Sequence, residues 1–133
     1  MAEKLTGFQV EQFKNLLYSR FSIVRLNLHE ELMSIDHESS EKIAEAVYQA
    51  TAGALTQLLT RLKAIDLNRY LTEIKDIESA LMRITEDRFG ICLDCGLPIY
   101  FKRLLSYPTA KRCVACQRLY EKTKNEIGSS GCP

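Results

Sequence analysis

Four cysteines near the C-terminal end of the chain have the residue type and the spacing of a metal site. They follow the pattern C-x2-C-x17-C-x2-C and comprise Cys92, Cys95, Cys113 and Cys116. Zinc binds four thiolates tetrahedrally at about 2.3 Å and then has no vacant position, which is typical of structural rather than catalytic sites. The sequence therefore predicts one structural Zn²⁺, whose binding energy also folds the short segment around it.

Two other uses of paired cysteines compete with zinc, namely two redox-active pairs or two disulfide bonds. A redox-active C-x2-C motif normally begins a helix in a βαβ unit, and no such strand pattern precedes Cys92. The fifth cysteine, Cys132, lies outside the spacing in a tail that contains Gly and Ser. We expect Cys132 to be a free, exposed thiol, and we favour zinc for the other four.

Basic residues lie close to the cysteines in the sequence, namely Lys102, Arg103, Lys111 and Arg112. A zinc ion with four thiolates carries a net negative charge, so partial neutralisation of that charge accounts for most of these side chains. Phosphate binding by the same group is the alternative interpretation.

No arrangement of residues indicates an enzyme. His29 and His37 lie in the first helical arm, far in sequence from the cysteines, and we expect them to be solvated rather than ligands or general bases. The sequence has no glycine-rich phosphate loop, no Ser/His/Asp ordering and no carboxylate pair in an apolar setting.

The charge distribution divides the chain into two parts. Residues 1–88 carry 11 basic and 14 acidic side chains, whereas residues 89–133 carry 7 basic and 3 acidic ones. Neither part is basic enough to indicate binding of duplex DNA by charge alone. No apolar run has the length of a membrane span, and the N-terminal residues lack the apolar core of a signal peptide. With thiols in C-x2-C pairs, this predicts a cytoplasmic protein.

Apolar residues recur at helical steps in two arms between about Phe8 and Arg88, a stretch with a single glycine, Gly53, and no proline. The first arm carries Val10, Leu17, Phe21, Val24 and Leu28, and the second carries Leu67, Tyr70, Ile74, Ile77, Leu81 and Ile84. Steps of three and four are typical of a coiled-coil seam. We predict a mainly α fold, a long antiparallel helical hairpin followed by a small four-cysteine finger and a C-terminal helix. Amphipathic helices in a compact bundle are the alternative.

The position of the chain reversal follows from pairing the two arms. Reflection about residue 51 places apolar residues opposite one another throughout, for example Val47 opposite Leu55 and Leu28 opposite Ile74. A reversal near residue 37 would give arms of unequal length. We therefore predict a tip near 48–54 and a kink or break at 34–40. A short extra helix at 41–50, folded differently, is the alternative.

The predicted domains are a coiled-coil hairpin over 1–88 and a zinc finger with a C-terminal helix and a flexible tail over 89–133. Within the finger, residues 97–101 resemble a short β segment, with Pro98 tolerable only at an edge. A helix is predicted over about 113–126, where Val114, Leu119 and Tyr120 form an apolar stripe.

The finger motifs F-G-I-C-L-D-C-G-L-P-I and R-L-L-S-Y-P-T-A-K-R-C-V-A-C-Q, joined directly to the helical arm, resemble the DksA/TraR family of bacterial transcription regulators. The resemblance is close over 65–120 and weak over 1–64. It implies a helical hairpin that binds RNA polymerase rather than promoter DNA, and we expect the protein to be a monomer. In such proteins the rod enters the secondary channel and its tip approaches the catalytic centre, often together with guanosine tetraphosphate.

The resemblance also assigns residues at the tip and at a nucleotide site. The family's tip pattern D-x-x-D-x-A aligns with 49–54, so that Gln49 and Ala52 replace the two acidic residues and Ala54 matches. Arg69 matches a family arginine and is a candidate partner or nucleotide contact. Other positions of the nucleotide site depart from the family, namely Asp76, Ala115 and Gln117. A guanosine tetraphosphate site of the usual kind is therefore not expected.

Together these features predict a transcription regulator that binds bacterial RNA polymerase at the secondary channel and carries a structural zinc. Two other functions remain open. One is a zinc-stapled coiled-coil adaptor for another protein, and the other is a thiol-based redox sensor that releases zinc on oxidation.

Overall fold

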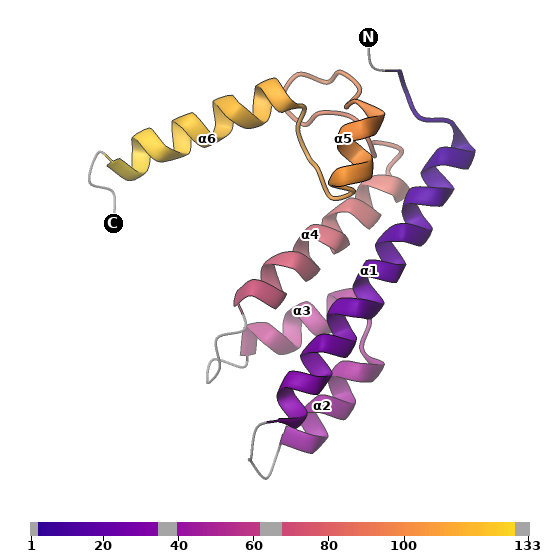
Figure 1. Ribbon diagram of the computed structural model, residues 1–133, viewed down its shortest axis with the longest axis vertical. Helices are drawn as coiled ribbons and strands as arrows, with labels where there is room; N and C mark the ends of the chain where they lie inside the picture. The colour runs from indigo at the N-terminus through magenta and orange to yellow at the C-terminus, as the bar shows by residue number, and fades with distance from the viewer. Residues whose placement is uncertain (1–2, 35–39, 62–67, 130–133) are drawn as a thin grey trace.

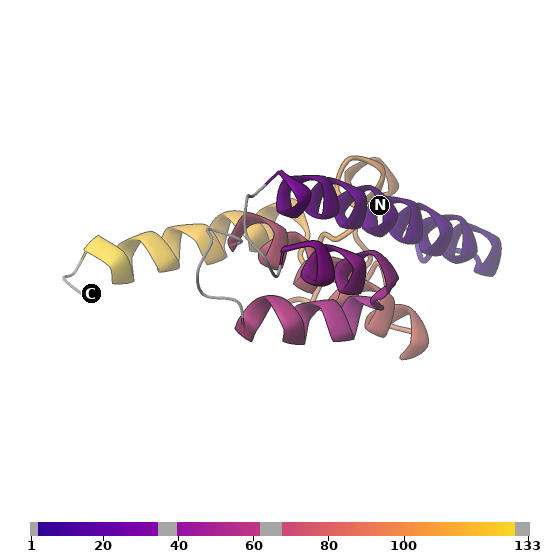
Figure 2. The same ribbon diagram turned by 90° about the horizontal axis from the view of Figure 1, so that it is seen from below.

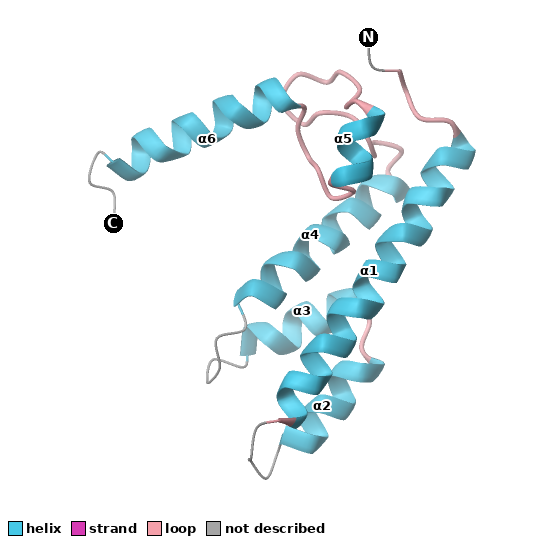
Figure 3. Ribbon diagram, in the orientation of Figure 1, coloured by secondary structure: helices cyan, strands magenta, loops and turns pink. Residues whose placement is uncertain are grey.

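The computed structural model describes residues 3–34, 40–61 and 68–129, and for 40–41, 59–61 and 125–129 it describes the backbone alone. Within these ranges the chain forms six helices joined by loops, without a strand (Figure 3). The helices are α1 (Gly7–Met33), α2 (Ser40–Gln49), α3 (Ala52–Arg61), α4 (Asn68–Thr85), α5 (Phe101–Ser106) and α6 (Val114–Ser129). The predicted mainly α fold class and the predicted C-terminal helix are confirmed.

Helix α1 is the longest element and forms the spine of the molecule (Figure 1). It begins at a capping box, in which the Thr6 hydroxyl accepts from the Gln9 amide and the Gln9 side chain accepts from the Thr6 amide. This pairing satisfies two amides that have no partner inside the helix. Its buried residues recur at steps of three and four, as in Phe13, Leu17, Phe21, Val24, Leu28 and Leu32. One continuous stripe of α1 therefore faces the core.

Helix α4 packs against α1, as the two-arm pattern predicted. Its fully buried residues include Ile74 and Ile77, whereas Leu81 and Ile84 are half-buried. Polar contacts fix the register, because the Tyr70 hydroxyl donates to the Glu31 carboxylate, which also forms an ion pair with Arg69 at 3.7 Å. The hydrogen bond to Glu31, with burial, raises the pKa of Tyr70. Leu67 lies outside the described residues.

The predicted tip at 48–54 is wrong. Helix α2 packs against α1, and α3 packs against α4. The α2–α3 connection therefore lies beside the middle of the helical arm that α1 and α4 form (Figures 1 and 2). The guanidinium of Arg25 donates to the Ala50 carbonyl at 3.2 Å, and the rings of His29 and Tyr48 lie 5.5 Å apart. The alternative of a short extra helix at 41–50 is therefore what the structure contains. The chain reverses direction between α1 and α2, and residues 35–39 lie outside the described residues.

Burial explains why reflection of the apolar pattern misplaced the reversal. Ala44, Val47 and Leu55 are fully buried in the observed fold, packed with α1 and α4 in one core. An extended hairpin would pair the same residues with one another. Apolar periodicity reports that a side chain is buried and not which helix buries it.

The finger lies at the end of the arm that carries the N-terminus of α1 (Figure 1). The ring of Phe13 on α1 contacts Phe89 at 5.5 Å and Phe101 at 5.7 Å between centroids. Aromatic pairs at these separations add to the stabilisation from burial alone. Helix α6 projects away from the other helices in both views (Figures 1 and 2).

Candidate metal centre and the adjoining cleft

The metal-binding segment begins at the end of α4. The backbone turns through Asp87 and Gly90, both with positive φ, and returns antiparallel to itself, with a single bridge between Ile91 and Pro98. The Ile99 amide donates to the Gly90 carbonyl at 2.7 Å. The expected β segment at 97–101 is thus reduced to this bridge, because α5 already begins at Phe101.

The four cysteine sulfurs converge, as the sequence spacing predicts. All four Sγ atoms lie within 4.8 Å of one another, and those of Cys95 and Cys113 are 3.9 Å apart. A tetrahedron of Zn–S bonds of about 2.3 Å requires sulfur atoms about 3.8 Å apart, so the arrangement fits one zinc ion. Cys92 is buried, Cys95 is exposed, and Cys113 and Cys116 are intermediate.

Backbone amides around the first sulfur favour its thiolate form. Burial of Cys92 disfavours the charged form, but hydrogen bonding from the backbone of Cys95, Cys113 and Asp94 outweighs it and lowers the pKa of Cys92 to about 6. The neighbouring thiols Cys113 and Cys92 raise the pKa of Cys116 to about 12. Four thiols this close cannot all ionise without a cation between them, which is the condition that Zn²⁺ supplies.

Gly90 and Gly96 provide a matched test of the turns around the site. Gly90 has φ +80°, and a Cβ added there would lie 2.9 Å from Leu5 Cδ1, whereas Gly96 has φ +73° and open space around it. Positive φ costs a residue with a Cβ about 1–2 kcal/mol. We expect Gly90→Ala to lower the free energy of unfolding more than Gly96→Ala does, because only Gly90 also meets a neighbour.

Chemical denaturation of the zinc-loaded variants measures this difference. Equal losses for the two variants would contradict the packing of Leu5 against Gly90.

Basic side chains beside the centre are largely engaged within the protein. Arg112 Nε donates to the Asp94 carboxylate at 2.8 Å, and its guanidinium lies 4.0 Å from the centroid of the Tyr120 ring. Arg103 Nε donates to the Arg112 carbonyl at 2.9 Å. Asp94 lies in the turn between Cys92 and Cys95, here called the first metal knuckle, so these contacts join this knuckle to α5 and α6.

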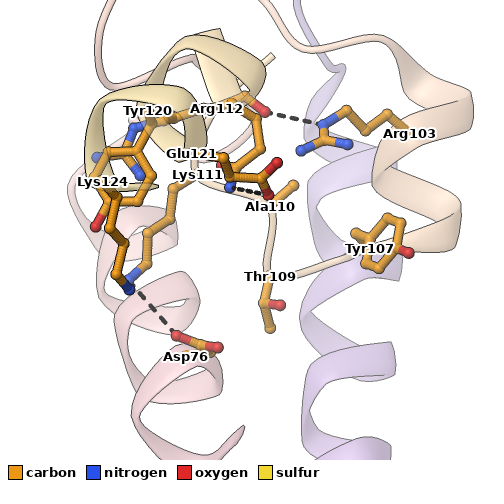
Figure 4. Close-up of a pocket in the computed structure, with 11 residues that line it drawn as sticks. Asp76, Arg103, Tyr107, Thr109, Ala110, Lys111, Arg112, Tyr120, Glu121 and Lys124 are labelled. Carbon is orange, nitrogen blue, oxygen red and sulfur yellow. Dashed lines mark hydrogen bonds and ion pairs between the residues drawn. The ribbon is translucent and has the colours of Figure 1, made fainter. Parts of the chain in front are cut away.

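A cleft of about 550 Å³ opens between α4, α5 and α6 (Figure 4). Lys111 from the finger forms an ion pair with Asp76 of α4 at 3.6 Å across it. Arg103, Lys124 and Glu121 also line the cleft, which therefore carries charges of both signs. The expectation of a phosphate site is weakened because Asp76 places a carboxylate in the cleft and pairs with one of its cations.

The predicted site residues outside the finger do not come together into one site. Gln49 ends α2, and Ala52 and Ala54 lie in the first turn of α3, beside the middle of the arm. Arg69 lies at the start of α4, where it contacts Glu31 and Tyr70. His29 is half-buried against Tyr48 rather than fully solvated. His37 and Cys132 lie outside the described residues.

Sequence inspection missed Arg83. It is 4% exposed, the sole buried charged side chain among the described residues. Arg83 follows the buried Ala80 by three residues, which places both on the same face of α4 and could have indicated burial. An arginine is ordinarily expected to be solvated, so this signal was not used.

Comparisons with known proteins agree with this geometry. Residues 87–122 match the family model of the prokaryotic DksA/TraR C4-type zinc finger. Over 54 residues the chain is 42% identical to the RNA polymerase-binding transcription factor DksA of Escherichia coli (strain K12), and 44% identical to that of Buchnera aphidicola. Each match covers 41% of this chain and 36% of the relative, so the similarity spans about a third of those proteins.

A solved structure shares the fold over most of the chain. The transcription factor DksA2 from Pseudomonas aeruginosa superposes with a TM-score of 0.56 at 23% sequence identity, covering 90% of this chain and 88% of that one. Within the described ranges, every helix is too short or too polar to span a bilayer.

Proposed function

Because its four-cysteine finger is of the DksA/TraR type, we propose that this protein binds bacterial RNA polymerase and regulates transcription initiation. The observation that supports this proposal most directly is that the stretch matching the C4 zinc finger, 87–122, contains four sulfurs arranged for one metal ion. The relatives that share this stretch are RNA polymerase-binding transcription factors. The helical arm then serves as the part that enters the secondary channel, and the protein acts as a monomer.

Binding to purified core polymerase tests this function directly. We expect the zinc-loaded protein to co-purify with core enzyme and to compete with another factor that occupies the secondary channel. Failure to associate at micromolar concentrations would remove the proposal. A stable dimer in light scattering, without polymerase binding, would instead favour a coiled-coil adaptor.

The α2–α3 connection does not serve as a tip in this proposal, because it lies beside the middle of the arm. Gln49, Ala52 and Ala54 occupy positions where the family carries its tip pattern, but two carboxylates are missing. We therefore expect the double variant Gln49→Asp, Ala52→Asp to match the parent in transcription in vitro. Exposed Glu45→Gln is a control that changes charge on α2 away from the connection. A clear gain of activity in the double variant, without one in the control, would show that this segment does act as the family tip.

Guanosine tetraphosphate is not included as a ligand. Asp76 stands where the family has a basic residue, and in this chain it pairs with Lys111. A polyphosphate in the cleft would have to displace that pair and approach the Asp76 carboxylate, which is electrostatically unfavourable.

A further inference from the structure

Arg83 is a buried cation whose contacts within the protein leave it without a counter-charge. Its Nη1 donates to Ser79 Oγ at 2.7 Å, and its Nη2 donates to the Thr109 carbonyl at a long 3.5 Å. A guanidinium has five N–H donors, so most of its capacity is unused. No carboxylate of the described residues lies within 4 Å of it.

The electrostatic setting of Arg83 favours an added anion. Burial lowers its pKa, the positive charge of Arg88 lowers it further, and Asp76 opposes this from a distance. Asp76 is itself paired with Lys111. Because an uncompensated buried charge is strongly unfavourable, a bound anion that reached Arg83 would be stabilised more than one at the surface.

A cavity of about 370 Å³ gives access to Arg83 from the side of α4 that faces the first metal knuckle. Its remaining charged lining residues are Lys75, Arg88, Glu78 and Glu86. Glu86 pairs with Arg88 at 3.0 Å, and Glu78 accepts from the Thr56 hydroxyl at 3.0 Å. Three cations therefore line the cavity against two carboxylates, and Arg83 is the buried one.

We propose that this cavity, the Arg83 pocket, binds a single carboxylate, supplied by an acidic side chain of the partner protein. The guanidinium fork matches the two oxygens of a carboxylate. The two glutamates disfavour a doubly charged phosphate, and Met82 and Leu93 add apolar walls suited to the stem of an Asp or Glu side chain. The identity of the partner as RNA polymerase rests on the proposed function.

The position of the pocket gives this contact a consequence for the fold. Leu93 lies between Cys92 and Asp94 in the first metal knuckle, while Arg83 lies on α4 and reaches the Thr109 carbonyl. A carboxylate bound between them contacts both the arm and the finger. Partner binding through this pocket therefore holds the finger in one orientation relative to the arm.

The first test uses the full-length, zinc-loaded protein and sodium acetate as the probe. Arginine Nε–Hε resonances are followed during titration with acetate, with sodium chloride and inorganic phosphate at matched ionic strength. We expect a saturable shift of the Arg83 resonance with acetate and little response to chloride. An Arg83 resonance that does not shift with acetate, or that shifts equally with phosphate, would overturn the assignment of a carboxylate to this pocket.

Variants separate the pocket from general charge effects. Arg83→Met should abolish the acetate-induced shifts of neighbouring resonances, and Arg118→Met, which removes an exposed arginine of α6 outside the cavity, should retain them. Arg83→Lys keeps the buried positive charge but lacks the paired N–H donors of a guanidinium. It replaces Arg83→Met in this test if Arg83→Met loses zinc or helix content. Retained acetate shifts in a folded Arg83 variant would overturn the proposal.

The second test identifies the source of the carboxylate. We expect Arg83→Met to bind core polymerase roughly thirtyfold or more weakly than the parent, the size of effect seen when one member of a buried charge pair is removed, with Arg118→Met close to the parent. If the parent binds polymerase and Arg83→Met binds equally well, the partner carboxylate is excluded. If the parent does not bind polymerase, the proposed function fails. The acetate titration still tests whether the Arg83 pocket binds a carboxylate.

Discussion

Removal of the metal is expected to unfold the finger. The finger has little else to hold it, since its buried apolar residues are few, among them Phe89, Ile99 and Leu104. Its loops have a single β-bridge. Four-thiolate zinc contributes about 10–16 kcal/mol in small fingers, comparable with or larger than the total stability of a typical domain. Both chelation and Cys92→Ser should therefore abolish the ordered structure around Cys92.

Zinc content by atomic spectroscopy, together with circular dichroism and amide resonances of the finger, measures this result. The matched control is Cys132→Ser, which removes a cysteine outside the C-x2-C spacing and should retain one zinc per chain. Because thiolates must lose their protons to bind the metal, acid should weaken zinc binding in the parent. A Cys92→Ser protein with full zinc content and an unchanged finger would refute the four-thiolate site.

The metal centre could be predicted from sequence because its determinants are local. Two C-x2-C pairs fix which sulfur atoms converge. The turns at Gly90 and Gly96 have positive φ, and glycine is the residue that indicates such a conformation. The α1–α4 seam was predictable for a related reason, since a helix period reveals its buried face over many turns. Ile74 and Ile77 were both expected in the seam and are both fully buried.

The folding back of α2 and α3 could not be predicted in the same way. It depends on contacts between distant residues, such as Arg25 with the Ala50 carbonyl and Thr56 with Glu78. Arg25 also lies over the rings of Phe21 and Tyr48, at 5.2 and 5.7 Å from their centroids. None of these polar or cation–π contacts produces a periodic pattern. Burial of Arg83 is hidden for the same reason, because its neighbour Thr109 is distant in sequence.

A single truncation in the α1 seam is expected to have the largest effect on the helical arm. Leu28 is fully buried, and Glu31, three residues further along, makes the contact with Tyr70 that fixes the α1–α4 register. Leu28→Ala should lower the free energy of unfolding by about 3 kcal/mol, because it removes buried methyl groups and leaves a cavity. Zinc should stay bound, since Leu28 is remote in sequence from the cysteines.

Leu26→Ala provides the control on the same helix, because Leu26 is 46% exposed. Its truncation should cost less than about 1 kcal/mol, as is usual for a surface position. Denaturant unfolding of both variants, saturated with zinc, gives the comparison. The observed fold requires the face of α1 that carries Leu28 to be covered by other helices and the face that carries Leu26 to be open. Equal losses would mean that both faces are covered in solution, and hence that α1 packs differently or has a partner on its outer side.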